Sequence, residues 1–282
     1  MDVIVALPAR DFDPTEAAVP WWQLTRAGHT VRFATPHGKR AKADPRLLGG
    51  WGFGPFQPLL LARGDARHHY AAMARDEHFA SPMSYQQLCE CRPMALVLPG
   101  GHAPGMRSYL ESVPLQTAVA NQFRANRAVA AICHGVLVAA RARDGDGRSL
   151  LHGRKTTALL ASMELSAWLM TRAWLGDYYR TYPETVESEV KRHLASEGDF
   201  IPGRPGLLAK VARLLPPRDR AEDSGRGFAL RSGFALRDGN YLSARWPGDA
   251  YTFSRALIAM LDERWAVTSA PTRCATPSAP KP

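Results

Sequence analysis

The sequence has no apolar run that approaches the roughly 18 residues a membrane-spanning helix needs. Its first residues, MDVIVALP, lack the basic segment and the cleavage site of a secretory signal peptide. Only four cysteines occur, and Cys89, Cys91, Cys133 and Cys274 do not form the disulfide framework of a secreted protein. We therefore expect no membrane partner and a location in the reducing cytoplasm.

Signatures of nucleic-acid binding are also missing, although the formal net charge is +10. The basic residues are scattered, and Asp or Glu interrupts even the richest stretch, KVARLLPPRDRAEDSGRGFALR. Neither zinc-finger spacing nor an aromatic RNA-binding motif accompanies them. The charge therefore indicates a solvated, arginine-rich surface, and we expect no nucleic-acid partner.

What the sequence does contain is an alternation of short apolar runs and amphipathic segments. It predicts strands at 2–7, 29–35, 95–98 and 129–132, and helices at 14–27, 112–126, 135–144 and 247–263. Residues 228–247 predict a hairpin that turns at Asp238-Gly239. Strands separated by helices favour an α/β fold, a parallel sheet with helices on both faces.

The organisation along the chain predicts a single domain over residues 1–264. Residues 37–92, rich in Gly, Pro and His, are predicted to be an irregular insertion or cap after the second strand. Residues 180–226 form an excursion, and the amphipathic pattern of YYRTYPETVESEVKRHL predicts a helix that covers the pocket or forms the face of a homodimer. Residues 265–282, rich in Pro, Ser, Thr and Ala, predict a disordered tail.

One junction places a thiol and an imidazole side by side between two apolar segments, in AVAAICHGVLVAARARD at residues 128–144. A strand that ends at Cys133 and a helix that begins near Gly135 predict a nucleophile elbow at the carboxyl ends of the strands. The N-terminus of that helix would favour thiolate, the reactive form of Cys133. The alternative is that Cys133 is a small buried hydrophobe, as free cysteines often are.

The start of the first predicted helix allows two interpretations. Asp13 and Glu16 have the spacing of a capping box, and Pro14 suits the first helical position, so capping alone would explain the D-P-T-E segment. Pro20 cannot donate a hydrogen bond to the carbonyl of Glu16, so the helix is expected to be distorted there. In the second interpretation, the Glu16 carboxyl lies in a dry pocket beside a thiol. Its pKa would then be raised, and it would share a proton with sulfur.

A glycine turn, Pro99-Gly100-Gly101, follows the third predicted strand. Glycines let backbone N–H groups face a bound oxygen, although an ordinary turn is the alternative. His102, next in line, would contact either substrate or solvent. The histidines of residues 37–92 lack a convincing metal-ligand spacing, so we expect neither a metal nor a cofactor.

Three segments together resemble the ThiJ/PfpI superfamily, the flavodoxin-like relatives of class I glutamine amidotransferases. They are DPTEAAVPWWQLTRAGHTVRFATPHGK at 13–39, LPGGHAPGM at 98–106, and AAICHG at the elbow. The resemblance is closest to the branch of heat-shock chaperones with glyoxalase III activity, and it implies a flavodoxin-like three-layer sandwich. It does not extend to amidotransferase activity, because the HPE motif is missing and Ala131 replaces the usual glycine.

The resemblance also implies roles for individual residues. Glu16 matches a glutamate that shares a proton with the elbow cysteine. The N–H groups of Gly101 and His134 correspond to an oxyanion hole. Gly100 precedes Gly101 in the same glycine turn.

A base and its orienting acid complete the implied site. His134 matches the histidine beside the nucleophile in the PfpI and heat-shock branches. Residues 152–166, HGRKTTALLASMELS, predict a strand, a loop and a helix start, where Glu164 matches the third triad member of fungal relatives. Alternatively, Glu164 only complements the dipole of the helix that it starts.

These implications predict an enzyme, a glutathione-independent lyase of the glyoxalase III type that acts in detoxification or stress response. Its substrate would be methylglyoxal or a similar small reactive aldehyde, and its product a 2-hydroxy acid such as lactate. Two alternatives stay open, a hydrolase (a cysteine amidase or peptidase) and a redox-sensing stress holdase in which Cys133 is oxidised. The same thiol could serve all three.

Overall fold

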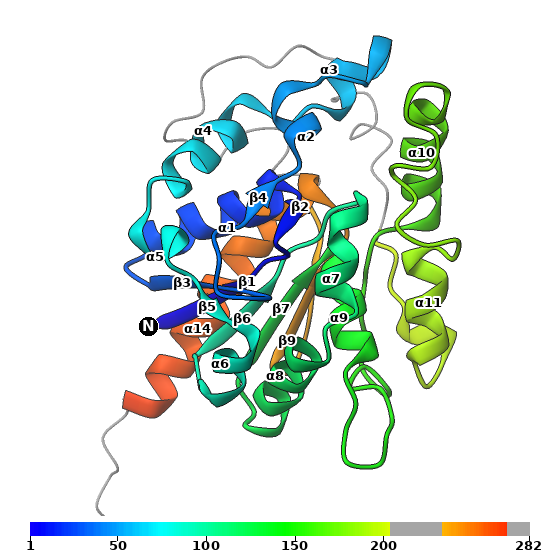
Figure 1. Cartoon of the computed structure of the whole chain (residues 1–282). Coiled ribbons are helices and arrows are strands. Elements are labelled where there is room, and N and C mark those ends of the chain that lie inside the picture. Colours follow the sequence, from blue (N-terminus) through cyan, green and yellow to red (C-terminus); the bar gives the residue numbers. More distant parts are fainter. Residues whose placement is uncertain (204–232, 270–282) are drawn as a thin grey trace, which may run out of the picture.

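The computed structural model describes residues 1–203 and 233–269, with side chains described as far as residue 264. In these ranges a seven-stranded sheet has the order β5-β3-β1-β6-β7-β9-β8 (Figure 1). All neighbouring strands are parallel except β8 and β9, which form an antiparallel pair. The strands are β1 (Asp2–Ala6), β3 (Thr30–Thr35), β5 (Met83–Ser84), β6 (Ala95–Leu98), β7 (Ala128–Ile132), β8 (Ala235–Asp238) and β9 (Tyr241–Ala244).

The central parallel strands β3-β1-β6-β7-β9 have the flavodoxin-like order 2-1-3-4-5, so the predicted fold class is confirmed. The sequences of β6 and β7, ALVL and AVAAI, are buried along their whole length, as expected for strands covered on both faces. In such a sheet a ligand binds outside the carboxyl ends of the strands, where the strand order reverses. That point lies between β1 and β6.

Helices cover both faces of the sheet (Figure 1). One layer contains α1 (Pro14–Arg26), α4 (Gly64–Met73) and α14 (Ala250–Ser269), and the other contains α6 (Tyr85–Glu90), α8 (Val113–Arg124), α9 (Val136–Arg141) and α11 (Val186–His193). Helix α10 (Ala161–Leu175) packs on α11 and on the 3₁₀ turn η1 (Gly54–Phe56). Among the described helices, none is both long and apolar enough to cross a membrane.

Residues 37–92 are not irregular, so that prediction is wrong. They form η1, α4, β5, α6, β4 (Lys42–Ala43), α2 (Pro45–Gly49), α3 (Gln57–Leu60) and α5 (Glu77–Ala80). Their prolines and glycines begin and end short helices: Asp44 caps α2, Pro45 starts it, and Gly50 ends it with a φ of 75°. Strand β4 pairs with β2 (Arg10–Phe12), whereas β5 extends the main sheet.

Three smaller expectations are also corrected. The hairpin of β8 and β9 turns at Gly239-Asn240, one residue later than predicted, because Asp238 still pairs with Tyr241. The strand predicted within 152–166 is reduced to a bridge between Thr156 and Phe200, because β9 occupies the place beside β7. The helix predicted over 178–194 is shortened to α11, since Pro183 disfavours a helix before it.

The predicted tail overlaps helix α14, which continues to Ser269 because the chain has no glycine or proline until Pro271. The remainder of the tail and residues 204–226 of the predicted excursion lie outside the described residues. The single domain over residues 1–264 therefore stays a prediction.

The elbow between β7 and α9 depends on close packing at Gly135. The 3₁₀ turn η3 (Cys133–Gly135) joins the two elements, and a Cβ at residue 135 would lie only 2.0 Å from the carbonyl oxygen of Leu98. Since that oxygen belongs to the end of β6, it cannot move aside without displacing the strand. Glycine is therefore required here.

We predict that Gly135→Ala lowers the free energy of unfolding by about 1–3 kcal/mol, the usual cost of overpacking a core. Urea unfolding measures this change. Gly145→Ala is the matched control, because a Cβ at residue 145 meets no atom within 4 Å. Equal unfolding midpoints for the two variants would contradict the proposed packing.

Candidate active site

The carboxyl ends of β1, β6 and β7 bring three segments together. Glu16 lies in the first turn of α1, Gly100 follows β6, and Cys133 follows β7. The N–H of Gly100 donates to Oε2 of Glu16 at 2.8 Å. A Cβ on Gly100 would lie 2.7 Å from the backbone nitrogen of His134 and 2.9 Å from Cβ of Cys133. The glycine turn therefore packs directly against the elbow, with the Glu16 carboxyl beside it.

Cys133 has the strained backbone that a nucleophile elbow requires. Its φ is 58°, in the left-handed region that non-glycine residues rarely adopt. Its side chain is buried, and its Sγ lies 3.5 Å from Nδ1 of His134. The sequence prediction of a sharp turn at this residue is confirmed.

The Glu16 carboxyl does not serve as half of a capping box. Asp13 caps α1 alone, since its Oδ1 accepts hydrogen bonds from the N–H groups of Thr15 and Glu16. The backbone N–H of Asp13 donates to the carbonyl of Gly100 instead of to Glu16. Oε1 of Glu16 is buried and makes no hydrogen bond to nitrogen or oxygen of the described residues. The Glu16 side chain interacts with the thiol of Cys133, so the carboxyl is placed to exchange a proton with sulfur or substrate.

Burial dominates the protonation of the pair formed by Glu16 and Cys133. It raises the pKa of Glu16 well above its usual range, and the nearby negative charge of Asp13 raises it further. Burial also raises the pKa of Cys133, as do the charges of Glu16 and Asp13, against the opposing effect of the His134 N–H. Both shifts favour the neutral forms of the two groups in this closed site, in contrast to the expected resting thiolate. The short helix α9 begins only at Val136 and does not outweigh the desolvation.

His134 is oriented to accept the thiol proton. The Thr181 hydroxyl donates its one hydrogen to the carbonyl of His102, at 2.7 Å. The oxygen of the same hydroxyl lies 3.3 Å from Nε2 of His134, so in this second hydrogen bond it must be the acceptor. Nε2 therefore carries the hydrogen, and Nδ1, which faces Sγ of Cys133, presents a lone pair. Burial, followed by His102 and Arg141, lowers the pKa of His134 well below its usual range, so its ring is neutral.

The structure does not place Glu164 in a triad with His134. Its Oε2 accepts from the N–H of Val186 at the start of α11, and its Oε1 pairs with Arg180 at 3.5 Å. Burial raises the pKa of Glu164, whereas these two partners lower it. Thr181 occupies the orienting position instead. Thr181 could not be identified from the sequence, because a hydroxyl in the segment TYPET belongs to no motif.

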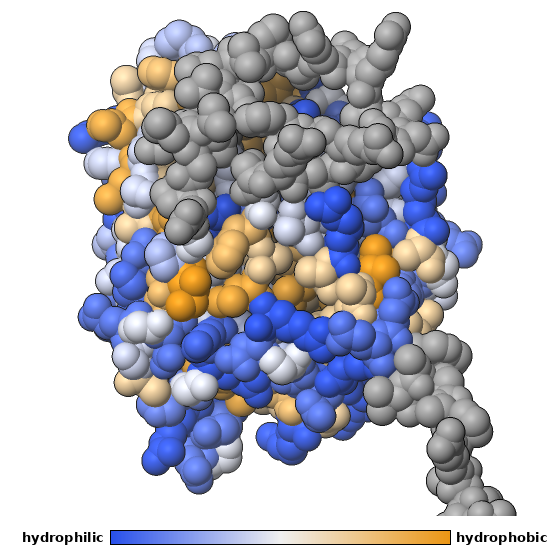
Figure 2. Space-filling model, turned by 180° about the vertical axis from the view of Figure 1, so that it is seen from behind, coloured by the Kyte–Doolittle hydropathy of each residue, from blue (hydrophilic) through white to orange (hydrophobic). Residues whose placement is uncertain are grey.

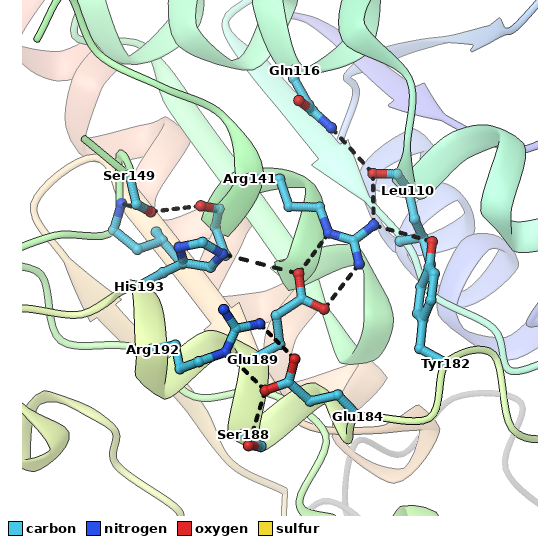
Figure 3. Close-up of polar contacts among 12 residues, drawn as sticks. Leu110, Gln116, Arg141, Ser149, Tyr182, Glu184, Ser188, Glu189, Arg192 and His193 are labelled. Carbon is cyan, nitrogen blue, oxygen red and sulfur yellow. Dashed lines mark hydrogen bonds and ion pairs between the residues drawn. The ribbon is translucent and has the colours of Figure 1, made fainter. Parts of the chain in front are cut away.

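A half-buried arginine fixes the segment next to Thr181 through the contacts that Figure 3 shows. Arg141, at the end of α9, binds both carboxylate oxygens of Glu189 on α11, at 2.7 and 2.9 Å. Its Nη1 also donates to the hydroxyl of Tyr182 and to the carbonyl of Leu110. The helix that follows the elbow is thereby tied to the residue next to Thr181. This bidentate geometry is specific to arginine.

His102 lies over the site as part of its cover. Its ring centroid is 4.8 Å from that of His134 and 6.0 Å from that of Tyr179. Tyr179 packs with Phe53 in a small apolar cluster, and its hydroxyl donates to Asp44 at 2.8 Å. The cover therefore joins the region after β3 to the segment after α10.

The two donors of the predicted oxyanion hole differ in their present partners. The N–H of Gly101 has no acceptor among the described residues, and the N–H of His134 faces the sulfur of Cys133. Their joint role toward a bound oxygen stays a prediction.

A family model described as ThiJ/PfpI family-like matches residues 7–192. The glutathione-independent glyoxalase hsp3101 of Schizosaccharomyces pombe is 27% identical over 153 residues, which cover 53% of this chain and 59% of that protein. The chain thus spans less than two thirds of this relative's length.

Solved structures share the fold. The crystal structure of glyoxalase III from Candida albicans superposes with a TM-score of 0.59 at 16% identity, over 92% of this chain and 96% of that one. The Rapid Encystment Protein of Francisella tularensis gives a TM-score of 0.63 at 14% identity, over 92% and 98% of the two chains.

The buried cap residue Asp13 makes stability depend on pH. Burial raises the pKa of Asp13 from 3.8 to about 6, so the folded protein keeps a proton that the unfolded chain has already lost. Stability should therefore fall as the pH rises through this window, by roughly 3 kcal/mol at most. Asp13→Asn keeps a capping oxygen and should remove this part of the loss.

Urea unfolding at several pH values across this window measures the effect. Asp76→Asn, at the half-buried cap of α5, controls for the substitution of a capping aspartate. The same pH dependence in wild type and Asp13→Asn would show that Asp13 does not hold the proton.

Proposed function

Because the chain belongs to the ThiJ/PfpI-like family, we propose that it is a cysteine-dependent enzyme that converts methylglyoxal, or a similar small α-oxoaldehyde, into a 2-hydroxy acid without glutathione. The observation that carries this proposal is the meeting of Cys133, Glu16 and His134 in one buried site. The partial similarity to a glutathione-independent glyoxalase supports the reaction class.

The first step is the formation of a hemithioacetal. Nδ1 of His134 takes the thiol proton, and the sulfur of Cys133 attacks the aldehyde carbon. The electron pair of the C=O bond moves to oxygen, where the N–H groups of Gly101 and His134 would stabilise the developing charge. Neutral Glu16, whose carboxyl is buried beside the thiol, can protonate this oxygen.

The second step is an isomerisation. Glu16 or His134 moves a proton from the carbon bonded to sulfur to the adjacent carbon through an enediol, while the hydroxyl proton of the hemithioacetal passes to the former ketone oxygen. The product is a thioester of the 2-hydroxy acid with Cys133. Water then cleaves the thioester, which releases the acid and restores the thiol, so the overall reaction is aldehyde plus water to hydroxy acid.

The burial of the site supports a small substrate. The side chains of Cys133 and Glu16 are 0% exposed, and that of His134 is 1% exposed. A peptidase needs an open groove that admits an extended chain, whereas an aldehyde of a few heavy atoms fits a closed pocket. The amidase or peptidase alternative is therefore less favoured.

A holdase role is the second candidate, and surface apolarity favours it. Large hydrophobic side chains are exposed on α10 and beside it: Leu165, Leu169, Trp174 and Trp51. Figure 2 shows a further band of hydrophobic surface across the face turned away in Figure 1, above mainly hydrophilic residues. Such patches mark contacts with other proteins.

The proposal predicts that the wild-type protein forms lactate from methylglyoxal without added glutathione, and that Cys133→Ala abolishes this activity. Cys89→Ala, which removes a half-buried thiol outside the site, is the control and should retain activity. A wild type that makes no lactate but suppresses the aggregation of an unfolded client would exclude the enzyme and support the holdase.

A second prediction concerns Glu16. In Glu16→Gln the amide cannot exchange a proton, so turnover should fall about 10²–10⁴-fold, the usual contribution of general acid–base catalysis. Thermal unfolding should change little, because Gln matches the shape of Glu and Asp13 still caps α1. Unchanged turnover would leave Glu16 with only a structural role.

A further inference from the structure

Three side chains that commonly bind metals converge over the elbow. They are His102, Cys133 and His134, and one ligand atom of each lies within 4.8 Å of the other two. In the described part of the chain, this is the one group of three potential metal ligands that contains histidine or cysteine. Cys133 and His134 are buried, and His102 is half-buried. The proposed reaction gives His102 no chemical step, although its ring packs against that of His134.

The spacing of the two buried ligands suits a tetrahedral ion. With a Zn–S bond of about 2.3 Å and a Zn–N bond of about 2.0–2.1 Å, neighbouring ligand atoms lie roughly 3.5 Å apart. Sγ of Cys133 and Nδ1 of His134 are separated by 3.5 Å. The half-buried His102 must rotate to close the remaining gap, by about 1.3 Å at most, since the three atoms lie within 4.8 Å of one another.

The tautomer of His134 is also suited to a metal. Its Nε2 hydrogen is directed to Thr181, which leaves the Nδ1 lone pair facing the sulfur. Two hydrogen bonds from Arg107 to the carbonyl of Thr181, at 3.0 and 2.7 Å, fix that residue. An outer partner of this kind fixes the ring orientation of metal-binding histidines.

We propose that His102, Cys133 and His134 bind a zinc-type divalent cation, which reversibly switches off the thiol. Two nitrogens and one thiolate suit zinc, whereas magnesium and calcium prefer oxygen ligands. On binding, the S–H proton leaves to solvent and a metal–sulfur bond forms, with no change of oxidation state. The fourth position takes water. The inhibition rests on the proposed function, but the binding does not.

Titration of the full-length apo-protein with Zn²⁺, followed by calorimetry, tests the binding. One ion per chain is expected. Cys133→Ala removes a ligand and should weaken binding by more than about 100-fold, because loss of a residue that only hydrogen-bonds to a ligand already costs about 10–100-fold. Thr181→Val should weaken it by about 10–100-fold, and Thr181→Ser should restore it. Cys91→Ala, a half-buried thiol outside the site, should bind as the wild type does.

Two measurements on the wild type do not depend on how the variants fold. Co²⁺ should give a thiolate-to-metal charge-transfer band and the strong visible bands of four-coordinate cobalt. Zn²⁺ should slow the alkylation of Cys133, but not that of Cys91, and should inhibit lactate formation in proportion to occupancy.

Stoichiometric zinc binding by Cys133→Ala with wild-type affinity would overturn the site, as would Co²⁺ spectra without a thiolate band. Stoichiometric binding that leaves activity unchanged or increases it would overturn the switch. A wild type without lactate activity refutes the proposed reaction but not the binding, which calorimetry and Co²⁺ spectra report independently.

Discussion

The hydrogen bond from the N–H of Gly100 to Glu16 ties together the segments that follow β1 and β6. It forms only because the chain has no Cβ at residue 100, where a side chain would collide with the elbow. Gly135 also has no Cβ, which lets the elbow pack against the end of β6. Two glycines thus allow three strand ends to meet at one point. The strained φ of Cys133 is maintained by this packing.

Desolvation is the second constraint on the site. Glu16 and Cys133 share a buried environment that disfavours both charged forms, so the pKa shifts favour a neutral resting pair. Reactivity then depends on a proton acceptor rather than on a stored thiolate. The neutral ring of His134 supplies that acceptor, and Thr181, fixed through Arg107 and the Arg141 network, sets its tautomer.

Local sequence pattern predicted the central strands and the elbow. Buried runs located β1, β6 and β7, and the switch from strand to helix at Cys133 identified the elbow. The orienting residue of His134 could not be predicted in this way. Its position depends on how α10 and α11 pack, and there Glu164 is used to cap α11. The pKa direction of Cys133 was missed for a similar reason, since burial is a property of the whole fold.

The direction of both pKa shifts leads us to expect Glu16 as a neutral carboxylic acid beside a neutral thiol at physiological pH. Infrared difference spectroscopy of wild type minus Glu16→Gln at neutral pH tests it directly. The account predicts a carbonyl stretch of a protonated carboxylic acid that is present in the wild type and absent from the variant. A difference spectrum with only carboxylate bands would show that Glu16 is ionised and would contradict the account.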